Sequence, residues 1–271
     1  MTRCQAGTGG LRVLQQSKQF LSMFGKPDYD ALAIGAHPDD VEIGCGGTLA
    51  KLARKGHKTA IVTTTSAELS SRGDTFTRSK EFAAAAQILG AHTHKMLDIP
   101  DGHVRASQAN KLKIVRVLRE LRPRVVFTHH WVARHPDHQH TCELVQEAFF
   151  LAGLAKIDTG QKPWRPYKLI HYPNRYEFQP SFVVDISDTF AAKIESIRAY
   201  HSQFHAADME KYGSVQTAIS HPAFLDHIEI RARQYGIYIG AQYGEPFLVR
   251  ENLAIDDPVA LFDERCWYAV P

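Results

Sequence analysis

Strand-like apolar runs and amphipathic segments alternate along the first half of the chain. The runs that predict strands cover residues 30–35, 59–65, 92–97 and 124–128. The segments between them carry apolar residues three and four positions apart, which is typical of helices. This alternation predicts an α/β fold of Rossmann-like type, with a mostly parallel sheet and helices on both of its faces.

The second half of the chain is less regular. Its pattern predicts two strands and then two helices, over 167–172, 181–186, 189–203 and 222–240. We find neither an internal repeat nor a clear linker, so we expect residues 28–271 to form a single domain with an irregular C-terminal elaboration. Residues 1–27 do not fit this pattern, and we interpret them as an N-terminal extension.

The composition excludes several classes of protein. Hydrophobic residues make up 44% of the 271 positions, charged residues 23%, and the net charge is +3. These values predict an ordinary globular core and, without a long basic run, disfavour nucleic acid as the main partner. No apolar run approaches the ~18 residues that span a membrane. The four cysteines include no CxxC pair, which indicates free thiols and, with the rest, a cytoplasmic protein.

His37, Asp39 and Asp40 directly follow the first predicted strand. Ligands of α/β proteins bind at such strand ends, but neither G-x-G-x-x-G nor GxxxxGK[ST] occurs here, and two carboxylates would repel a phosphate. Histidine and aspartate suit a divalent cation such as zinc. The motif alone fits a capped helix with a chance histidine equally well. We expect the glycines that follow to let the first helix pack close to the sheet.

A second histidine motif follows the fourth predicted strand. The stretch 129–140 reads HHWVARHPDHQH, and its HPDH sequence repeats the His-Pro-Asp order of the first motif. If Pro136 begins a helix, His135 and His138 face the same cleft. Both motifs then converge on one edge of the sheet, which favours a metal site. The remaining histidines are interpreted as members of a solvated loop: His129, His130 and His140.

A mononuclear catalytic zinc site needs about three protein ligands and an open position for water. His37, Asp40 and His138 can supply the three ligands, which leaves Asp39 and His135 beside the metal. A zinc hydrolase uses such groups as a base for the water and as an acid or cation near the carbonyl oxygen. One alternative is a non-catalytic metal- or sugar-binding protein, which needs neither group. A nucleotide-binding regulator is disfavoured by the missing phosphate loop.

AHPDDVEIGCGGTLAKL (36–52) and RHPDHQHT (134–141) resemble the paired motifs of the LmbE/PIG-L-like zinc N-deacetylases. Members of this family remove acetyl groups from N-acetylglucosamine-type compounds, and the similarity covers about residues 29–250. Four further stretches resemble the bacillithiol-biosynthesis branch, which acts on N-acetylglucosaminyl malate: LDIPDGHV, PSFVVDISD, AYHSQF and YGEPF.

The resemblance implies roles for the residues of both motifs. His37, Asp40 and His138 match the ligands of one zinc ion, or of another divalent cation. Asp39 matches the general base. A protonated His135 matches the residue that stabilises the oxyanion formed when water attacks the acetamide, or that acts as an acid. Asp137 matches the residue that orients this imidazole.

On the substrate side, Arg78 matches an arginine that contacts substrate. Phe224 stands where some relatives have a tyrosine that donates to the oxyanion, which a phenyl group cannot do. A malate-bearing substrate needs cationic partners, for which Arg105 and Lys193 are further candidates, although such residues more often lie on solvated helix faces. The alternative substrate is another N-acetyl sugar, such as N-acetylglucosamine or diacetylchitobiose. Relatives are often trimers or hexamers, so we expect a homo-oligomer.

Overall fold

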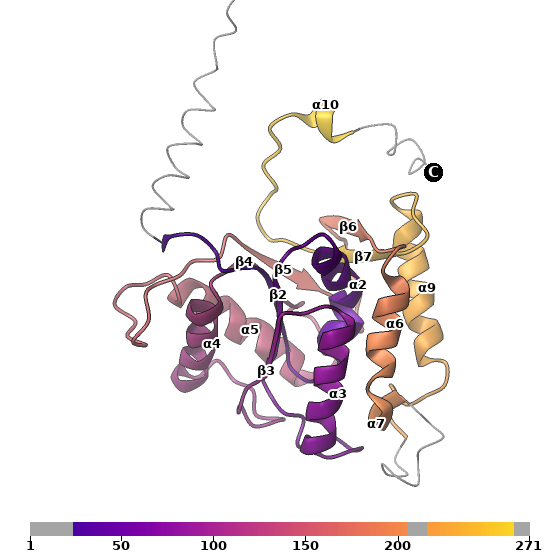
Figure 1. Cartoon of the computed structure of the whole chain (residues 1–271), viewed down its shortest axis with the longest axis horizontal. Coiled ribbons are helices and arrows are strands. Elements are labelled where there is room, and N and C mark those ends of the chain that lie inside the picture. The colour runs from indigo at the N-terminus through magenta and orange to yellow at the C-terminus, as the bar shows by residue number, and fades with distance from the viewer. Residues whose placement is uncertain (1–23, 205–215, 263–271) are drawn as a thin grey trace, which may run out of the picture.

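A five-stranded parallel sheet forms the centre of the molecule (Figure 1). The structure, a computed structural model, describes residues 24–204 and 216–262. The elements are β1 (Tyr29–Gly35), α2 (Asp40–Arg54), β2 (Thr59–Thr63), α3 (Thr75–Ile88), β3 (Thr93–Met96), α4 (Gln108–Leu121), β4 (Pro123–His129), α5 (Pro136–Leu151), β5 (Lys168–Tyr172), β6 (Phe182–Asp185), α6 (Phe190–Arg198), α7 (His201–Phe204), α9 (Phe224–Ile237), β7 (Gly244–Phe247) and α10 (Pro258–Leu261).

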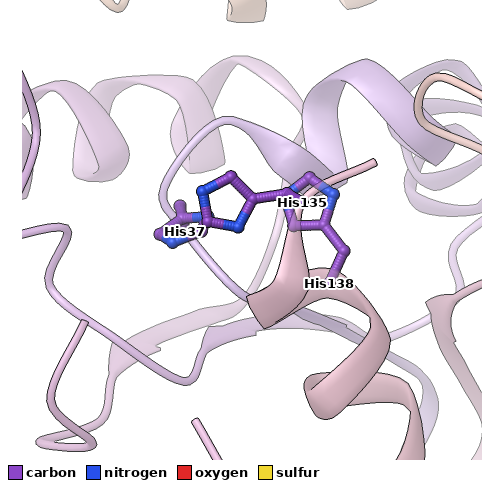
Figure 2. Close-up of side chains that lie close together, drawn as sticks. All are labelled: His37, His135 and His138. Atoms are coloured by element: carbon purple, nitrogen blue, oxygen red, sulfur yellow. The ribbon is translucent and has the colours of Figure 1, made fainter. Parts of the chain in front are cut away.

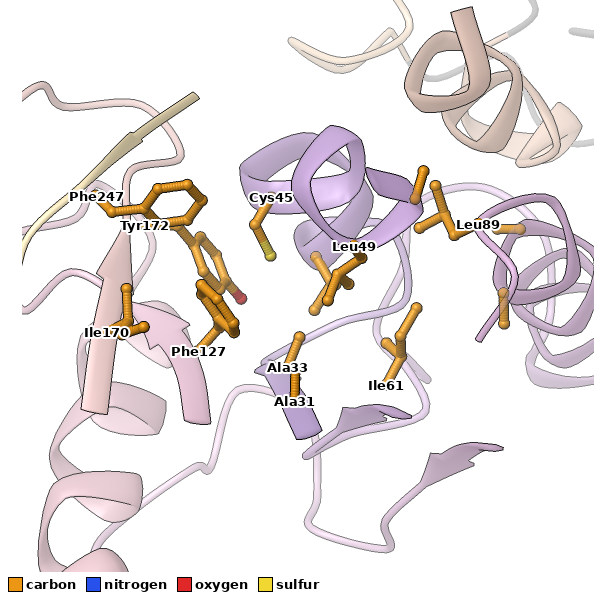
Figure 3. Packing of buried hydrophobic residues seen from close by; sticks show 14 of the residues in the cluster. Ala31, Ala33, Cys45, Leu49, Ile61, Leu89, Phe127, Ile170, Tyr172 and Phe247 are labelled. Atoms are coloured by element: carbon orange, nitrogen blue, oxygen red, sulfur yellow. The ribbon is translucent and has the colours of Figure 1, made fainter. Parts of the chain in front are cut away.

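The predicted parallel sheet with helices on both faces is confirmed. The strands lie in the order β3-β2-β1-β4-β5, so β1 and β4 are neighbours although they are distant in sequence. Alternate residues of β1 point to opposite faces: Ala31 and Ala33 pack with α2 and α3, and Leu32 and Ile34 pack with α4 and α5. Figure 3 shows the first of these two clusters. Because both faces are buried, the middle of β1 from Ala31 to Ile34 is an uninterrupted apolar run.

The C-terminal elaboration differs from its predicted elements. β6 and β7 form a separate antiparallel pair, and β7 was not predicted because it has only four residues and contains a proline. The predicted helix 189–203 is divided into α6 and α7. The chain leaves the helix at Tyr200, and the backbone N–H of Ser202 at the start of α7 then donates to the buried Glu81 carboxylate at 2.6 Å.

The first helix lies close to the sheet, as expected from its glycines. A Cβ at Gly44 would lie 2.2 Å from the ring of Tyr172 on β5. A Cβ at Gly47 would lie 2.8 Å from the side chain of Ile186. Neither position therefore has room for a side chain. Glycine at these two positions lets α2 pack directly against Tyr172 and Ile186.

A buried ion pair of the C-terminal elaboration, Lys193 with Glu245, also forms hydrogen bonds to α2. α2 is kinked at Cys45, and beyond the kink the backbone N–H groups of Gly47 and Thr48 donate to the Glu245 carboxylate at 3.0 and 2.7 Å. Glu245 also lies 2.5 Å from Nζ of Lys193, and each of the two side chains is 3% exposed. The carboxylate therefore satisfies an ammonium group and two backbone donors at once.

Some predictions fall outside the described part of the chain. Residues 1–23 of the predicted extension and the two cysteines Cys4 and Cys266 lie there, whereas Cys45 and Cys142 are free, buried thiols. Among the described helices, none has the length and apolar character needed to cross a membrane. The domain boundary at residue 28, the cytoplasmic location and the oligomeric state stay predictions.

Candidate active site

The two His-Pro-Asp motifs meet at the C-terminal edge of the sheet. The first forms the turn after β1, and the second leads into α5 just beyond β4. Figure 2 shows His37 from the first motif beside His135 and His138 from the second. The ring centroids of His37 and His135 are 4.8 Å apart, and those of His37 and His138 are 5.6 Å apart. The structure thus brings both motifs into one site, which the parallel strands had suggested.

Asp40 lies close to both histidines that were predicted to bind a metal ion with it. Among the described residues, the groups whose ligand atoms all lie within 4.8 Å of one another are His37–His135–His138, Asp40–His129–His138 and His37–Asp101–Asp137. Nδ1 of His37 lies 3.4 Å from Oδ2 of Asp40, and Nε2 of His138 lies 3.0 Å from Oδ1 of the same carboxylate. Two ligands bound at ~2.1 Å to one tetrahedral zinc ion are about 3.4 Å apart. Burial lowers the pKa of His138 to about 4, so its imidazole is neutral and can bind a cation.

The other ring nitrogen of His37 faces two carboxylates. Nε2 lies 2.9 Å from Oδ1 of Asp101 and 3.6 Å from Oδ2 of Asp137. Because an ionised carboxylate only accepts, Nε2 donates, and Nδ1 is the nitrogen that faces Asp40. Burial acts to lower the pKa of His37, but hydrogen bonds to the surrounding carboxylates outweigh it and raise the pKa well above 6.5. A metal ion bound at Nδ1 therefore displaces a proton.

His135 caps the N-terminus of α5. Its Nδ1 accepts from the backbone N–H of Asp137 at 3.2 Å, while the Asp137 carboxylate accepts from the N–H of Gly102 at 2.7 Å. Asp137 thus orients His135 through its backbone instead of its carboxylate. Burial and the charge on His37 lower the pKa of His135, which disfavours the protonated form assumed from the sequence. The neutral ring nevertheless carries a proton on Nε2, and this N–H is a donor.

Asp39 sits in a strained backbone conformation next to a buried guanidinium group. Its φ is 108°, a value that non-glycine residues rarely adopt and that is often found at functional sites. NH2 of Arg78 donates to Oδ2 of Asp39 at 3.0 Å and also to the carbonyl oxygen of Pro38. Burial raises the pKa of Asp39 to about 6, although Arg78 opposes this shift. Such a carboxylate is suited to accept a proton near neutral pH.

Two residues missed by the sequence interpretation lie against Asp40, and of these Asn174 donates to it. Nε2 of His129 accepts from the N–H of Ala36 at 2.9 Å and lies 3.3 Å from Oδ2 of Asp40. Asn174 donates to Oδ1 of Asp40 at 3.2 Å, and its own Oδ1 lies 2.9 Å from Nδ1 of His129. The interpretation of His129 as solvated is therefore wrong. It is 1% exposed because it ends β4 at the edge of the sheet where the site forms.

The other two histidines assigned to a solvated loop differ from each other. His130 is also buried, and its ring packs on Trp131 and Phe178 with centroids 4.2 and 4.8 Å away, so for it too the interpretation is wrong. His140 is half-buried on α5, and its Nδ1 lies 2.7 Å from NH1 of Arg105.

A cavity of about 450 Å³ opens onto the site. Arg78 and Phe224, both singled out from the sequence, line it, and so do Arg134 and Arg175. The guanidinium groups of Arg134 and Arg175 form no hydrogen bond or ion pair with the described residues. Within the described part of the chain, two cationic groups at the cavity are therefore available to a ligand.

The two further cations suggested as substrate partners do not line this cavity. Arg105 contacts His140 and the carbonyl oxygen of Val104, and Lys193 is occupied by the buried Glu245. The structure therefore does not support a role in substrate binding for Arg105 or Lys193, whereas Arg134 and Arg175 do line the cavity.

Known proteins are similar to this chain in sequence and in fold. Residues 32–149 match the PIG-L family, described as GlcNAc-PI de-N-acetylase, and this match includes both His-Pro-Asp motifs. A diacetylchitobiose deacetylase from Thermococcus kodakarensis is 32% identical over 185 residues, which cover 64% of this chain and 69% of that protein. A 4-oxalmesaconate hydratase from Pseudomonas putida is 28% identical over 197 residues, which cover 66% and 76%. The crystal structure of the conserved protein TT1542 from Thermus thermophilus gives a TM-score of 0.76 at 37% identity, covering 84% of this chain and 98% of that one.

Proposed function

The chain belongs to the PIG-L deacetylase family and is an amide hydrolase, and we propose that it removes the N-acetyl group from an N-acetylglucosamine conjugate. The observation that supports this proposal is the position of Asp39 and His135 in one cavity with His37, Asp40 and His138, the proposed metal ligands. A protein that only binds a metal or a sugar needs neither a buried carboxylate with a pKa of about 6 nor an imidazole N–H beside it.

We propose zinc as the metal, held by His37, Asp40 and His138. The Asp40 carboxylate lies 3.4 Å from Nδ1 of His37 and 3.0 Å from Nε2 of His138. Two imidazoles and one carboxylate are the ligand type and number of a catalytic zinc site. When bound, such an ion supplies Lewis-acid activation of water and of the acetamide carbonyl. Asp101 and Asn174 support the ligands from outside, as second hydrogen-bond partners of metal ligands commonly do.

The remaining chemistry is assigned to the protein's own side chains. Asp39 takes a proton from the attacking water, and the Nε2–H of His135 donates to the oxyanion of the tetrahedral intermediate. One such donor is typically worth about 3 kcal/mol in the transition state. Arg78 keeps the Asp39 carboxylate in place through its N–H···O bond. The proton held by Asp39 then goes to the leaving amine, and acetate and a free amino sugar are released.

The cavity favours an anionic conjugate over a neutral sugar. Arg134 and Arg175 are exposed at the cavity and have no partner among the described residues. Guanidinium groups bind carboxylates with strong, charge-assisted hydrogen bonds. We therefore propose N-acetylglucosaminyl malate, the substrate of bacillithiol biosynthesis, in preference to free N-acetylglucosamine or diacetylchitobiose, which offer these cations no negative charge.

The central test is an acetate-release assay on these three compounds, with and without a chelator. We expect acetate from N-acetylglucosaminyl malate, loss of the activity with chelator, and about one zinc ion per chain in the purified protein. A metal-free but active enzyme would contradict the zinc assignment, and no acetate from any N-acetyl sugar would contradict the deacetylase assignment. A hydratase adds water without releasing acetate, so the same readout separates that activity from deacetylation.

Replacing the free arginines tests the substrate. Arg134→Ala and Arg175→Ala should each raise KM for N-acetylglucosaminyl malate about 10-fold or more, because a hydrogen bond to a charged group contributes about 1.5–3 kcal/mol. KM for diacetylchitobiose should change less than about twofold. Arg116→Ala, an exposed arginine of α4 away from the cavity, is the control. Equal effects on both substrates would count against an anionic conjugate.

A further inference from the structure

Asp101 lies between His37 and one wall of the cavity. Its Oδ1 accepts from Nε2 of His37 at 2.9 Å, and its Oδ2 accepts from the backbone N–H of Leu69 at 3.2 Å. Its own backbone N–H donates to Oε1 of Glu68 at 2.6 Å. Asp101 is 7% exposed, so these bonds are shielded from water. One carboxylate thus contacts a proposed metal ligand with one oxygen and a loop with the other.

The loop that Asp101 contacts is part of the cavity. It connects β2 with α3, and its residues at the cavity are Ala67, Leu69, Ser70 and Ser71. Ala67 has a φ of 55°, an uncommon value for a residue with a Cβ, and the Leu69 side chain is 67% exposed. An exposed loop with a strained backbone needs attachment points, and Asp101 provides two of them, through Leu69 and Glu68.

The neighbouring carboxylate lies farther from His37 than Asp101 does. Oδ2 of Asp137 lies 3.6 Å from Nε2 of His37, which is beyond hydrogen-bond distance, and it already accepts from the N–H of Gly102 at 2.7 Å. Asp101 therefore makes the hydrogen bond that fixes which nitrogen of His37 faces Asp40.

We propose that Asp101 is a positioning residue that orients His37 toward the metal and attaches the loop 66–71 to the same imidazole. The proposal rests on the ligand set given above. A histidine ligand that donates its second N–H to a carboxylate is held in one tautomer and one orientation and is a stronger base. Because the same carboxylate fixes Leu69, occupation of the metal position and the shape of the cavity wall depend on one side chain.

Zinc affinity in the absence of substrate tests this role. Asp101→Ala should raise the zinc dissociation constant 10- to 100-fold, measured by competition with a chromophoric chelator. Asp101→Asn keeps one acceptor oxygen and should lose less. The thermal midpoint of both metal-free variants should stay close to that of the metal-free wild type. Asp98→Ala is the matched control, because Asp98 lies on the same connection but is exposed and pairs with Lys113 at 2.9 Å.

The results of this experiment distinguish the positioning role from the ligand set and from the proposed function. Wild-type zinc affinity in Asp101→Ala, or an equal loss in Asp98→Ala, would overturn the positioning role. A wild-type chain that binds no zinc would overturn the ligand set and the positioning role together. If the expected loss of affinity occurs in a protein that deacetylates none of the sugars, the positioning role stands and the proposed function fails.

Discussion

Asp39→Asn is expected to lower kcat for amide hydrolysis by about 10²- to 10⁴-fold while zinc remains bound. The carboxamide cannot take a proton from water, but its oxygen can still accept the N–H of Arg78, which lies 3.0 Å from Oδ2. Asparagine also tolerates a positive φ better than alanine does, so the turn is kept. The measurement is acetate release at saturating substrate together with the zinc content of the same sample.

His138→Ala is the contrasting variant, because it should lose zinc and activity together. If Asp39→Asn is fully active, another group is the base. If instead it loses its zinc, Asp39 acts as a ligand, and the division of roles between Asp39 and Asp40 is wrong.

Glu245→Ala is expected to lower the free energy of unfolding by about 3–5 kcal/mol. The change leaves the ammonium group of Lys193 buried without its carboxylate and removes the acceptor of two backbone N–H groups at the α2 kink. Lys193→Met should cost less, since Glu245 would keep the N–H groups of Gly47 and Thr48 as donors. Urea unfolding of the metal-free proteins measures both values.

An exposed ion pair provides the comparison for this experiment. Oε2 of Glu147 lies 2.9 Å from Nζ of Lys111, and the Glu147 side chain is 44% exposed. Glu147→Ala should cost less than about 1 kcal/mol. If Glu245→Ala costs no more than Glu147→Ala, the buried pair does not hold the C-terminal elaboration in place.

The place of the site could be predicted because parallel strands end at the same edge of the sheet. The ends of β1 and β4 each carry a His-Pro-Asp motif, and the repetition made both recognisable. Asp101 and Asn174 also follow strand ends, those of β3 and β5, but neither belongs to a repeated motif. A side chain that turns back from a loop leaves no periodic pattern, so only the structure shows that they contact His37 and Asp40.

The second half of the chain was harder to predict for a related reason. Lys193 and Glu245 are 52 residues apart. The backbone N–H groups that donate to Glu245 follow a kink at Cys45, within a segment whose sequence pattern is helical. Lysine and glutamate usually indicate solvated positions, so nothing local marks this pair as buried. His129 was misjudged in the same way, because polar residues in a buried hydrogen-bond network look like surface residues in the sequence.

The strand order also determines when the metal position can exist during folding. Ala36 and His129 are in contact although 93 residues separate them, so the site forms only after β4 has paired with β1 across that long loop. Until then, the histidines of residues 129–140 are available to zinc in the unfolded chain. Metal bound there stabilises the unfolded state and reduces the net stabilisation that the ion gives to the native protein. In refolding, zinc is therefore best added after the chain has folded.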